Sequence, residues 1–183
     1  MRSLTTVLLL SLVALAMGCA PSVTVTLDYD KEMNFAALNT FAWLPIPVNP
    51  PANVKEALER NSLMDKRIRR AVEAQLAVKA YHMHETNPDF MITYHIGIQE
   101  KIAVTDWGYD YGRRGWGAPS RIDVYQYQEG TLVLDVIDSH SKQLIWRSVA
   151  QGVIDPSAPI EKREQRLNDV VTRMLADFPP AGK

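Results

Sequence analysis

The sequence predicts an α+β fold, a two-layer sandwich in which a mostly antiparallel sheet carries two helices packed on one face. Two observations support this prediction. Several segments alternate between apolar and polar residues, as half-buried strands do, and most of them follow one another without an intervening helix. Two other segments repeat apolar residues every three or four positions, as amphipathic helices do. Runs of adjacent strands favour antiparallel pairing, and two helices can cover one face of such a sheet.

Residues 1–18 have the pattern of a bacterial lipoprotein signal peptide. Arg2 precedes an apolar run over residues 7–17, which is shorter than the ~20 residues of a membrane-spanning helix. The stretch Leu-Ala-Met-Gly-Cys at 15–19 resembles a lipobox, in which the signal peptidase cuts before a cysteine that carries a diacylglyceryl group. Cys19 is the single cysteine of the chain, so we expect it to be lipidated. An ordinary cleaved signal peptide or an uncleaved anchor is the alternative.

Lipidation would determine where the protein is found. Two or more acyl chains, such as a diacylglycerol plus a palmitate, anchor a protein stably to a membrane. Ala20 stands where an Asp would resemble an inner-membrane retention signal. We therefore expect an outer-membrane lipoprotein of the cell envelope. In it, residues 19–22 form a short tether and residues 23–180 form one domain that faces the periplasm.

The charge balance argues against two classes of partner. The chain has 20 Lys and Arg against 21 Asp and Glu, a formal net charge of −1. A protein that binds nucleic acid needs positive charge to displace the counterions of the phosphate backbone, and none is concentrated here. No polybasic patch for anionic lipids is visible either.

The first part of the domain is predicted to contain two strands and a helix. Residues 23–29 alternate, and after a turn around Asn34 residues 40–44 form a second strand. The proline-rich segment 45–51 is an extended connector. A helix then begins near Ser62, which with Asp65 resembles a capping box. Its predicted buried stripe is Met64, Ile68, Ala71, Val72, Leu76 and Ala80.

The second part is predicted to contain the remaining strands and a closing helix. An Asn-Pro-Asp turn at 87–89 opens a strand over 90–99. Residues 105–119 form a loop, and further strands follow at 122–127, 132–136 and 144–149, with a turn at 139–142. The helix runs from about Ser157, a plausible N-cap, to Asp177, where two prolines stop it. The residues of 90–99 predicted to point inward are Phe90, Ile92, Tyr94, Ile96 and Ile98.

The loop at 105–119 is the main candidate for contact with a partner or ligand. Tryptophan and tyrosine combine a large apolar face with a polar edge, and arginine binds carboxylate or phosphate in a bidentate way. This composition is common in protein and glycan contact surfaces. The alternative is a glycine-rich loop that folds its aromatic side chains back onto the sheet. The candidate contact residues are Trp107, Tyr109, Tyr111, Arg113, Arg114 and Trp116.

Other polar residues give little support for catalysis or metal binding. His82 and His84 could share a metal in an extended segment, but a site needs three or four ligands, and a polar connector is the simpler interpretation. Asp135 is expected to pair with Arg147 across a hairpin, and Asp138 to shape the turn. No recognisable nucleophile, zinc or phosphate-loop motif is present. We therefore expect no catalytic residues and no cofactor.

Four segments, taken together, resemble a known family. They are FAALNTFAW at 35–43, NPDF at 87–90, EGTLVLDVID at 129–138 and KQLIWR at 142–147. In order and spacing they resemble the bacterial lipoprotein family catalogued as domain of unknown function 4136, over about residues 23–180. This family often has Gly where the chain has Ala80 and Ser148. The resemblance implies the sandwich fold and an envelope location, and it implies no activity.

Two hypotheses for function follow. The first is a non-enzymatic lipoprotein that binds an envelope partner, such as another protein, peptidoglycan or lipid. The second is a periplasmic domain that binds a small ligand or a metal through the 105–119 loop or the His82 and His84 segment. An enzymatic role has no positive support in the sequence, and the oligomeric state is left open.

Overall fold

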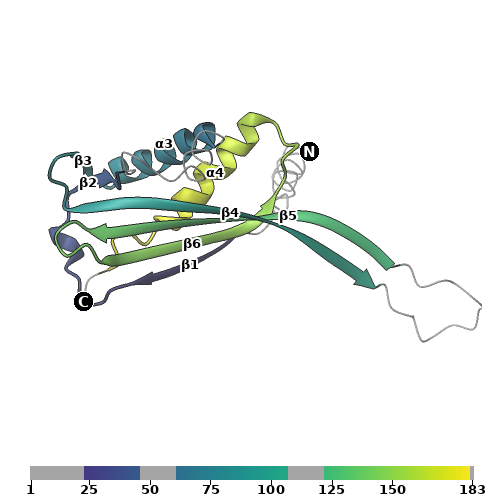
Figure 1. Ribbon diagram of the computed structural model, residues 1–183, viewed down its shortest axis with the longest axis horizontal. Coiled ribbons are helices and arrows are strands. Elements are labelled where there is room, and N and C mark those ends of the chain that lie inside the picture. The colour runs from purple at the N-terminus through teal and green to yellow at the C-terminus, as the bar shows by residue number, and fades with distance from the viewer. Residues whose placement is uncertain (1–22, 46–60, 107–121, 182–183) are drawn as a thin grey trace, which may run out of the picture.

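A computed structural model describes residues 23–45, 61–106 and 122–181. Within them the chain forms one six-stranded mixed sheet with the order β1-β6-β5-β4-β2-β3, and two α-helices lie along one side of it (Figure 1). The predicted α+β class is confirmed. The elements are β1 (Thr24–Tyr29), the 3-10 turn η1 (Phe35–Ala37), β2 (Thr40–Trp43), α3 (Ser62–Val78), β3 (His82–Met83), β4 (Phe90–Asp106), β5 (Ile122–Asp138), β6 (Leu144–Ile154) and α4 (Ile160–Met174).

The sheet is mixed, and the predicted antiparallel pairing holds for three of the five strand pairs that the described residues form. Strands β1, β6, β5 and β4 pair antiparallel, as the run of adjacent strands predicts. Strand β2 is parallel to both β4 and β3. The physical reason lies in the connection, because α3 separates β2 from β4 and parallel neighbours need such a crossover helix. The two-residue strand β3 falls in the segment that the sequence predicted as a polar connector.

Strand β5 is continuous, and the prediction of separate strands at 122–127 and 132–136 was wrong. Its 17 residues pair without interruption with the 17 residues of β4. Gly130, which lies between the two predicted strands, faces Ile98 on one side and Gly152 on the other. A glycine weakens an isolated strand, but here pairing on both sides keeps Gly130 extended.

Helix α3 begins near Ser62 and packs on the sheet as predicted, but its N-cap and its C-terminal end differ from the prediction. Ile68, Val72 and Leu76 are fully buried or nearly so, with exposed fractions of 0–1%. The N-cap is Asn61, and the predicted capping box of Ser62 and Asp65 does not form. The reason is that the Asp65 carboxylate accepts hydrogen bonds from side chains of β4 and α3 instead. The predicted stripe also extended too far at both ends, because Met64 is exposed and Ala80 lies beyond the helix.

Helix α4 begins later than predicted. Ser157 is not its N-cap, because its backbone N–H and its hydroxyl both donate to Asp155 Oδ1, at 3.0 and 2.6 Å. That turn ends before the helix, whose N-cap is Pro159. Val171 and Met174 are buried against the sheet, whereas Ile160 is half exposed.

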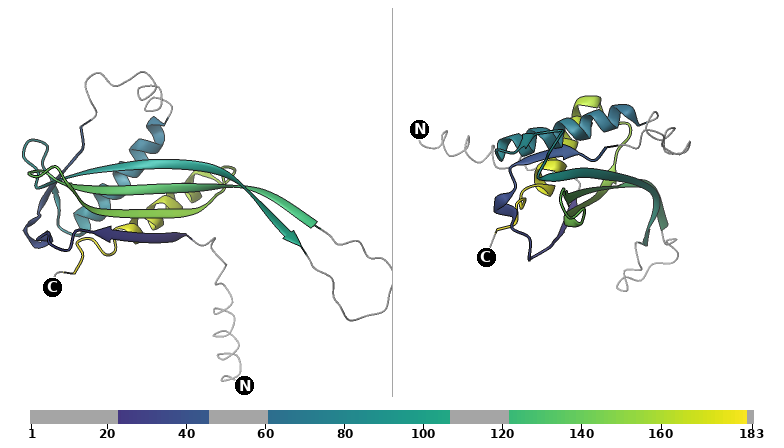
Figure 2. Two further views of the ribbon diagram at one scale, coloured as in Figure 1. Left: turned by 60° about the horizontal axis from the view of Figure 1, so that its bottom comes forward. Right: turned by 60° about the vertical axis from the view of Figure 1, so that its left-hand side comes forward.

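The core is centred on the ring of Phe178, which follows α4. Four aromatic rings surround it at centroid distances of 5.2 to 6.2 Å, and all of them come from other parts of the chain. The left view of Figure 2 shows α3 and α4 crossing the same side of the sheet. The segment after α4, which carries Phe178, packs against rings of the sheet. The four rings belong to Phe35, Tyr81, Phe90 and Trp146.

Candidate functional site

The feature that leaves the body of the fold is the distal part of the β4–β5 hairpin. Pairing of β2 with β4 stops at Ile92, and pairing of β6 with β5 stops at Gln128. The two long strands continue as a two-stranded ribbon from the pair Lys101↔Tyr127 to the last pair, Asp106↔Ile122. At ~3.4 Å per residue, this ribbon extends about 20 Å beyond the end of β6. We call residues 101–106 and 122–127 the arm, and Figure 1 shows it projecting from the sheet.

The sequence-predicted contact residues belong to the segment that joins the two strands of the arm. Residues 107–121 connect Asp106 to Ile122 and lie outside the described residues, as do residues 1–18 and Cys19. The structure therefore describes the support of the predicted contact loop. The contact residues that fall in this segment are Trp107, Tyr109, Tyr111, Arg113, Arg114 and Trp116.

The strand face that is buried in the body becomes exposed towards the arm. Phe90 and Ile92 are fully buried under the helices. On the same face, Ile96 is 43% exposed, Ile98 61% and Ile102 63%. The prediction that Ile96 and Ile98 point into the core was wrong, because the helices cover only the first part of this long strand. Ile96, Ile98 and Ile102 thus form an exposed, largely apolar stripe on β4 that Glu100 interrupts.

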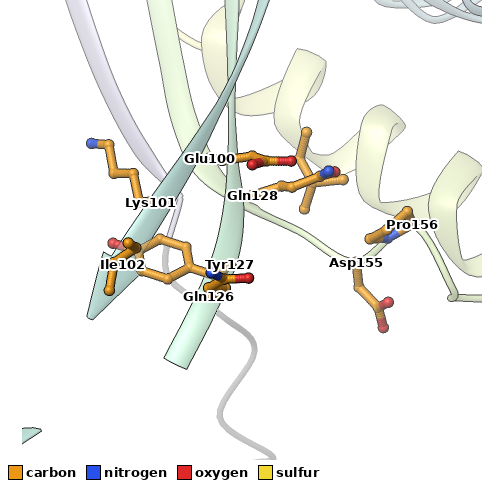
Figure 3. Close-up of a pocket in the computed structure, with 9 residues that line it drawn as sticks. Glu100, Lys101, Ile102, Gln126, Tyr127, Gln128, Asp155 and Pro156 are labelled. Atoms are coloured by element: carbon orange, nitrogen blue, oxygen red, sulfur yellow. The ribbon is translucent and has the colours of Figure 1, made fainter. Parts of the chain in front are cut away.

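A groove lies where the arm leaves the sheet. It has a volume of about 610 Å³, and its lining comes from β4, β5 and the end of β6. Figure 3 shows Glu100 and Gln128 on one side, with Asp155 and Pro156 beyond the end of β6, while Lys101 points away from them. The Asp155 carboxylate already accepts the two bonds from Ser157, which lower its pKa below 3.8. The groove therefore offers mixed polar and apolar contacts rather than a set of free acids.

The opposite, helix-free face of the sheet carries paired charges. Arg147 donates to Asp135 through Nε at 2.6 Å and through Nη2 at 2.7 Å, which confirms the predicted cross-hairpin pair. The hydrogen bond and charge of Asp135 raise the pKa of Arg147. His95 lies 3.8 Å from the same carboxylate. At the base of the arm, Lys101 pairs with Glu129, whose hydrogen bond raises the pKa of the lysine.

Two further aspartates shape the end of the sheet opposite the arm. Asp138 Oδ2 accepts the backbone N–H of Ser141 at 2.6 Å and that of His140 at 3.1 Å, which confirms its predicted role in the turn. Asp89 Oδ2 accepts the backbone N–H groups of Asn39 and Thr40, at 2.9 and 2.8 Å, and so joins β2 to β4. These backbone bonds lower the pKa of both carboxyl groups. The sequence identified Asp89 as part of a turn but not as this link between strands.

A polar and aromatic cluster between α3 and the sheet was not predicted. Tyr94 Oη donates to Asp65 Oδ1 at 2.7 Å, and Arg69 Nε donates to the same oxygen at 2.7 Å. The Arg69 guanidinium lies 4.5 Å from the centroid of the Trp43 ring, and Trp43 Nε1 donates to Glu73 at 2.8 Å. Burial, followed by the hydrogen bond to Asp65, raises the pKa of Tyr94. In the sequence, the spacing of four residues between Asp65, Arg69 and Glu73 on α3 was the signal that could have indicated this cluster.

The two histidines of the weak metal candidate are exposed at the edge of the sheet. His82 lies in β3, and the Nδ1 atom of His84 accepts the backbone N–H of Asn87 at 3.3 Å. Across the described parts of the chain, no group of three His, Cys, Asp or Glu side chains could hold a metal ion. In residues 23–45, 61–106 and 122–181, no helix is both long and apolar enough to cross a bilayer.

Solved structures resemble the chain in fold. A PDZ domain protein from Parabacteroides distasonis ATCC 8503 aligns with a TM-score of 0.55 and 15% identity, over 89% of this chain and 36% of that one. The chain thus spans about a third of that protein's length. Two PelC dodecamer structures from Paraburkholderia phytofirmans align with TM-scores of 0.39 and 0.38, each at 10% identity over 85% of this chain and 95 and 96% of theirs. No curated protein matches the chain.

The family is shown by sequence. A family model described as "Domain of unknown function (DUF4136)" matches residues 25–180, which include all of the sheet except the first residue of β1, and both helices. The family to which the sequence segments pointed is thereby confirmed: the chain belongs to the family of domain of unknown function 4136.

Proposed function

We propose that the chain is a non-enzymatic contact module of the cell envelope, anchored through lipidated Cys19 to the outer membrane, with its domain in the periplasm. In this proposal the arm holds residues 107–121 against an envelope partner. The observation that carries the proposal is the arm itself, which continues the β4–β5 ladder to Asp106 and Ile122, well beyond the last residue of β6. Binding residues are commonly found on loops that a rigid scaffold positions in this way.

The position of the N-terminus supports this arrangement. Thr24 at the start of β1 pairs with Gln151, three residues before the end of β6. The start of β1 therefore lies at the end of the sheet from which the arm projects. Val23 is the fourth residue after Cys19, so the chain between them spans at most ~14 Å. A lipid on Cys19 would hold this end of the domain close to the membrane surface.

The composition of residues 107–121 indicates the chemistry of the partner. Tryptophan and tyrosine stack on sugar rings and on apolar protein surfaces, and two adjacent arginines bind carboxylates. Peptidoglycan and envelope proteins both offer these groups. A small ligand is the second candidate, and the groove of about 610 Å³ at the base of the arm favours it. A metal ion has weaker support, because His82 and His84 have no third ligand among the described residues.

Two experiments test the two parts of the proposal separately. Intact mass spectrometry of the membrane fraction tests the anchor: we expect a chain that starts at residue 19 with added acyl groups, and a soluble, unmodified Cys19→Ala variant. An unmodified wild-type chain would remove the anchor from the proposal.

Crosslinking in intact envelopes tests the contact. We expect the combined substitution Trp107→Ala, Tyr111→Ala and Trp116→Ala to abolish specific adducts while the thermal unfolding of the domain is retained. Val78→Ala is the matched control, because Val78 is 82% exposed on α3, far from the arm. Unfolding of the triple variant would instead place these rings in the core. Unchanged adducts would exclude the loop as the contact surface.

A further inference from the structure

Strand β4 has a long open edge. Its last pair with β2 is Trp43↔Ile92, yet the strand continues from Thr93 to Asp106. On that side, no other strand pairs with these residues within the described parts of the chain. An exposed edge of this length is a template for pairing with another strand.

The backbone groups of this edge can be assigned to alternate residues. The carbonyl oxygen of Ile92 accepts the backbone N–H of Leu44 at 2.9 Å, so it points away from β5. In an antiparallel strand, alternate residues direct both backbone groups to the same side. The residues that present N–H and C=O groups to the open side are therefore Tyr94, Ile96, Ile98, Glu100 and Ile102.

The edge has only part of the usual protection against pairing. Proteins guard edges with prolines or with charged side chains, and residues 93–106 contain no proline. Among its charged residues, Lys101 is engaged by Glu129, whereas Glu100 and Asp106 give the edge partial protection. The side chains of Ile98 and Ile102 are more than half exposed beside this edge. A two-stranded ribbon of this kind is only marginally stable alone, so a partner strand would stabilise the arm.

We propose that this edge pairs antiparallel with the same edge of a second copy, with the two-fold axis at Gln99. Gln99 is the centre of the segment Thr93–Thr105, so this register pairs its full length. It places Ile96 opposite the partner's Ile102 and Ile98 opposite the partner's Glu100. No two like charges face each other in it, since Lys101 lies opposite the partner's Gly97. A two-fold axis also closes the assembly, because each open edge is used once.

The register makes a prediction about one residue pair. Since the even-numbered residues direct their backbone groups to the open side, Gln99 would face its own copy in a non-hydrogen-bonded pair. The two Cα atoms of such a pair lie about 4.5 Å apart, within the range that a disulfide spans. Under mild oxidation, we expect the full-length Gln99→Cys protein in its own membranes to form a covalent dimer on a non-reducing gel.

Two controls accompany this experiment. The wild type, with Cys19 as its sole cysteine, reports any crosslink through the native thiol. Gln151→Cys places the same substitution at another exposed position of the sheet, in β6, whose two sides are already paired with β1 and β5. We expect both to remain monomeric. Equal crosslinking of Gln99→Cys and Gln151→Cys would overturn the proposal, as would the absence of a Gln99→Cys dimer.

A second variant tests whether the edge itself makes the contact. Ile98→Pro, added to Gln99→Cys, removes one edge-directed N–H and leaves the β4–β5 ladder its own hydrogen bonds. We expect it to abolish the covalent dimer while circular dichroism and thermal unfolding show a folded domain. Ile98→Val in the same background should crosslink like the parent. A crosslink that survives Ile98→Pro would exclude pairing through this edge. Repeating the series with Cys19→Ala protein in solution removes the native thiol and the anchor, so that the same outcomes test the edge whether or not Cys19 is lipidated.

Discussion

Arg147 and Asp135 face each other across the β5–β6 ladder, joined by two hydrogen bonds of 2.6 and 2.7 Å. The side chain of Asp135 is 5% exposed, so water cannot replace the guanidinium if it is lost. The pair therefore neutralises a carboxylate that the fold buries on the helix-free face of the sheet.

We predict that Arg147→Met lowers the free energy of unfolding by about 3 kcal/mol, because it leaves that buried carboxylate without its two hydrogen bonds and with only His95, 3.8 Å away, beside it. Chemical denaturation followed by fluorescence measures this loss. Arg67→Met is the control, since the carboxylate that it pairs with, on Glu164, is 46% exposed to water and the pair should contribute less than about 1 kcal/mol. Equal losses for the two variants would contradict this explanation.

Asp89 is predicted to make the stability depend on pH. Its folded pKa lies below the ordinary value of 3.8 because backbone N–H groups of β2 bind its charged form. Its contribution is therefore present above about pH 4 and is lost as the pH falls through the depressed value. We expect Asp89→Asn to cost about 1–2 kcal/mol at neutral pH, since bonds to a charged acceptor are the stronger ones.

Urea unfolding at neutral pH and near pH 3 checks this prediction. The difference between wild type and Asp89→Asn should shrink at the lower pH. Asp169→Asn, a change at an exposed position of α4, should leave the neutral-pH stability almost unchanged. A difference between wild type and Asp89→Asn that does not vary with pH would mean that the charge of Asp89 contributes nothing.

Ala80 is predicted to be a strained residue. Its φ angle is 64°, in the left-handed region, where it follows the C-cap of α3. This conformation costs a residue with a Cβ about 1–2 kcal/mol, and glycine adopts it freely. We therefore expect Ala80→Gly to stabilise the domain by about 1 kcal/mol, which a shift in the denaturation midpoint would measure. Ala77→Gly, inside the helix, should instead destabilise it by about 1 kcal/mol. The same sign for both variants would contradict the argument.

Two glycines at the base of the arm should respond differently to the same change. A Cβ atom on Gly130 would lie 2.5 Å from Ile154 Cδ1, whereas on Gly97 the nearest atom would be Thr131 Cβ at 3.9 Å. We expect Gly130→Ala to lower the thermal unfolding temperature, by a cost of about 1 kcal/mol for displacing the end of the Ile154 side chain. Gly97→Ala should be neutral or slightly stabilising, because alanine suits a strand better than glycine does. A larger loss from Gly97→Ala would contradict the packing described.

The apolar and polar pattern of the sequence predicted correctly those elements that are covered in the same way along their whole length. The helix stripe through Ile68, Val72 and Leu76 is buried as its spacing indicates. The pairing of Asp135 with Arg147 could be predicted from the hairpin, because opposite charges at facing positions attract. The family was also recognisable, since its segments keep their order and spacing.

The errors occurred where distant parts of the chain decide the outcome. Alternation predicts which residues of β4 share a face, but not that the helices end before Ile96 and leave that face exposed. Ser62 and Asp65 satisfy the pattern of a capping box, yet Tyr94 competes for the Asp65 carboxylate from across the core. The parallel β2–β4 pair was predictable in principle from the strand–helix–strand order around α3. Within the candidate site, the sequence predicted the loop but not the arm that supports it. The arm forms because Gly130 stays extended inside a continuous β5, where the sequence predicted a break between two strands.

The placement of β1 at the sheet edge has a mechanical consequence. A force that enters the chain at Val23 and acts along β1 loads its six register pairs with β6 together, which is a shearing geometry. A force at right angles to the strand would break those pairs one at a time, beginning at Thr24↔Gln151. Arg173 of α4 donates to the carbonyl oxygen of Val23 at 2.7 Å, so that the first point to bear the load is also tied to the helix layer. A force applied at this end of the domain would therefore act on the contact between Val23 and α4 before the pairs between β1 and β6 begin to break.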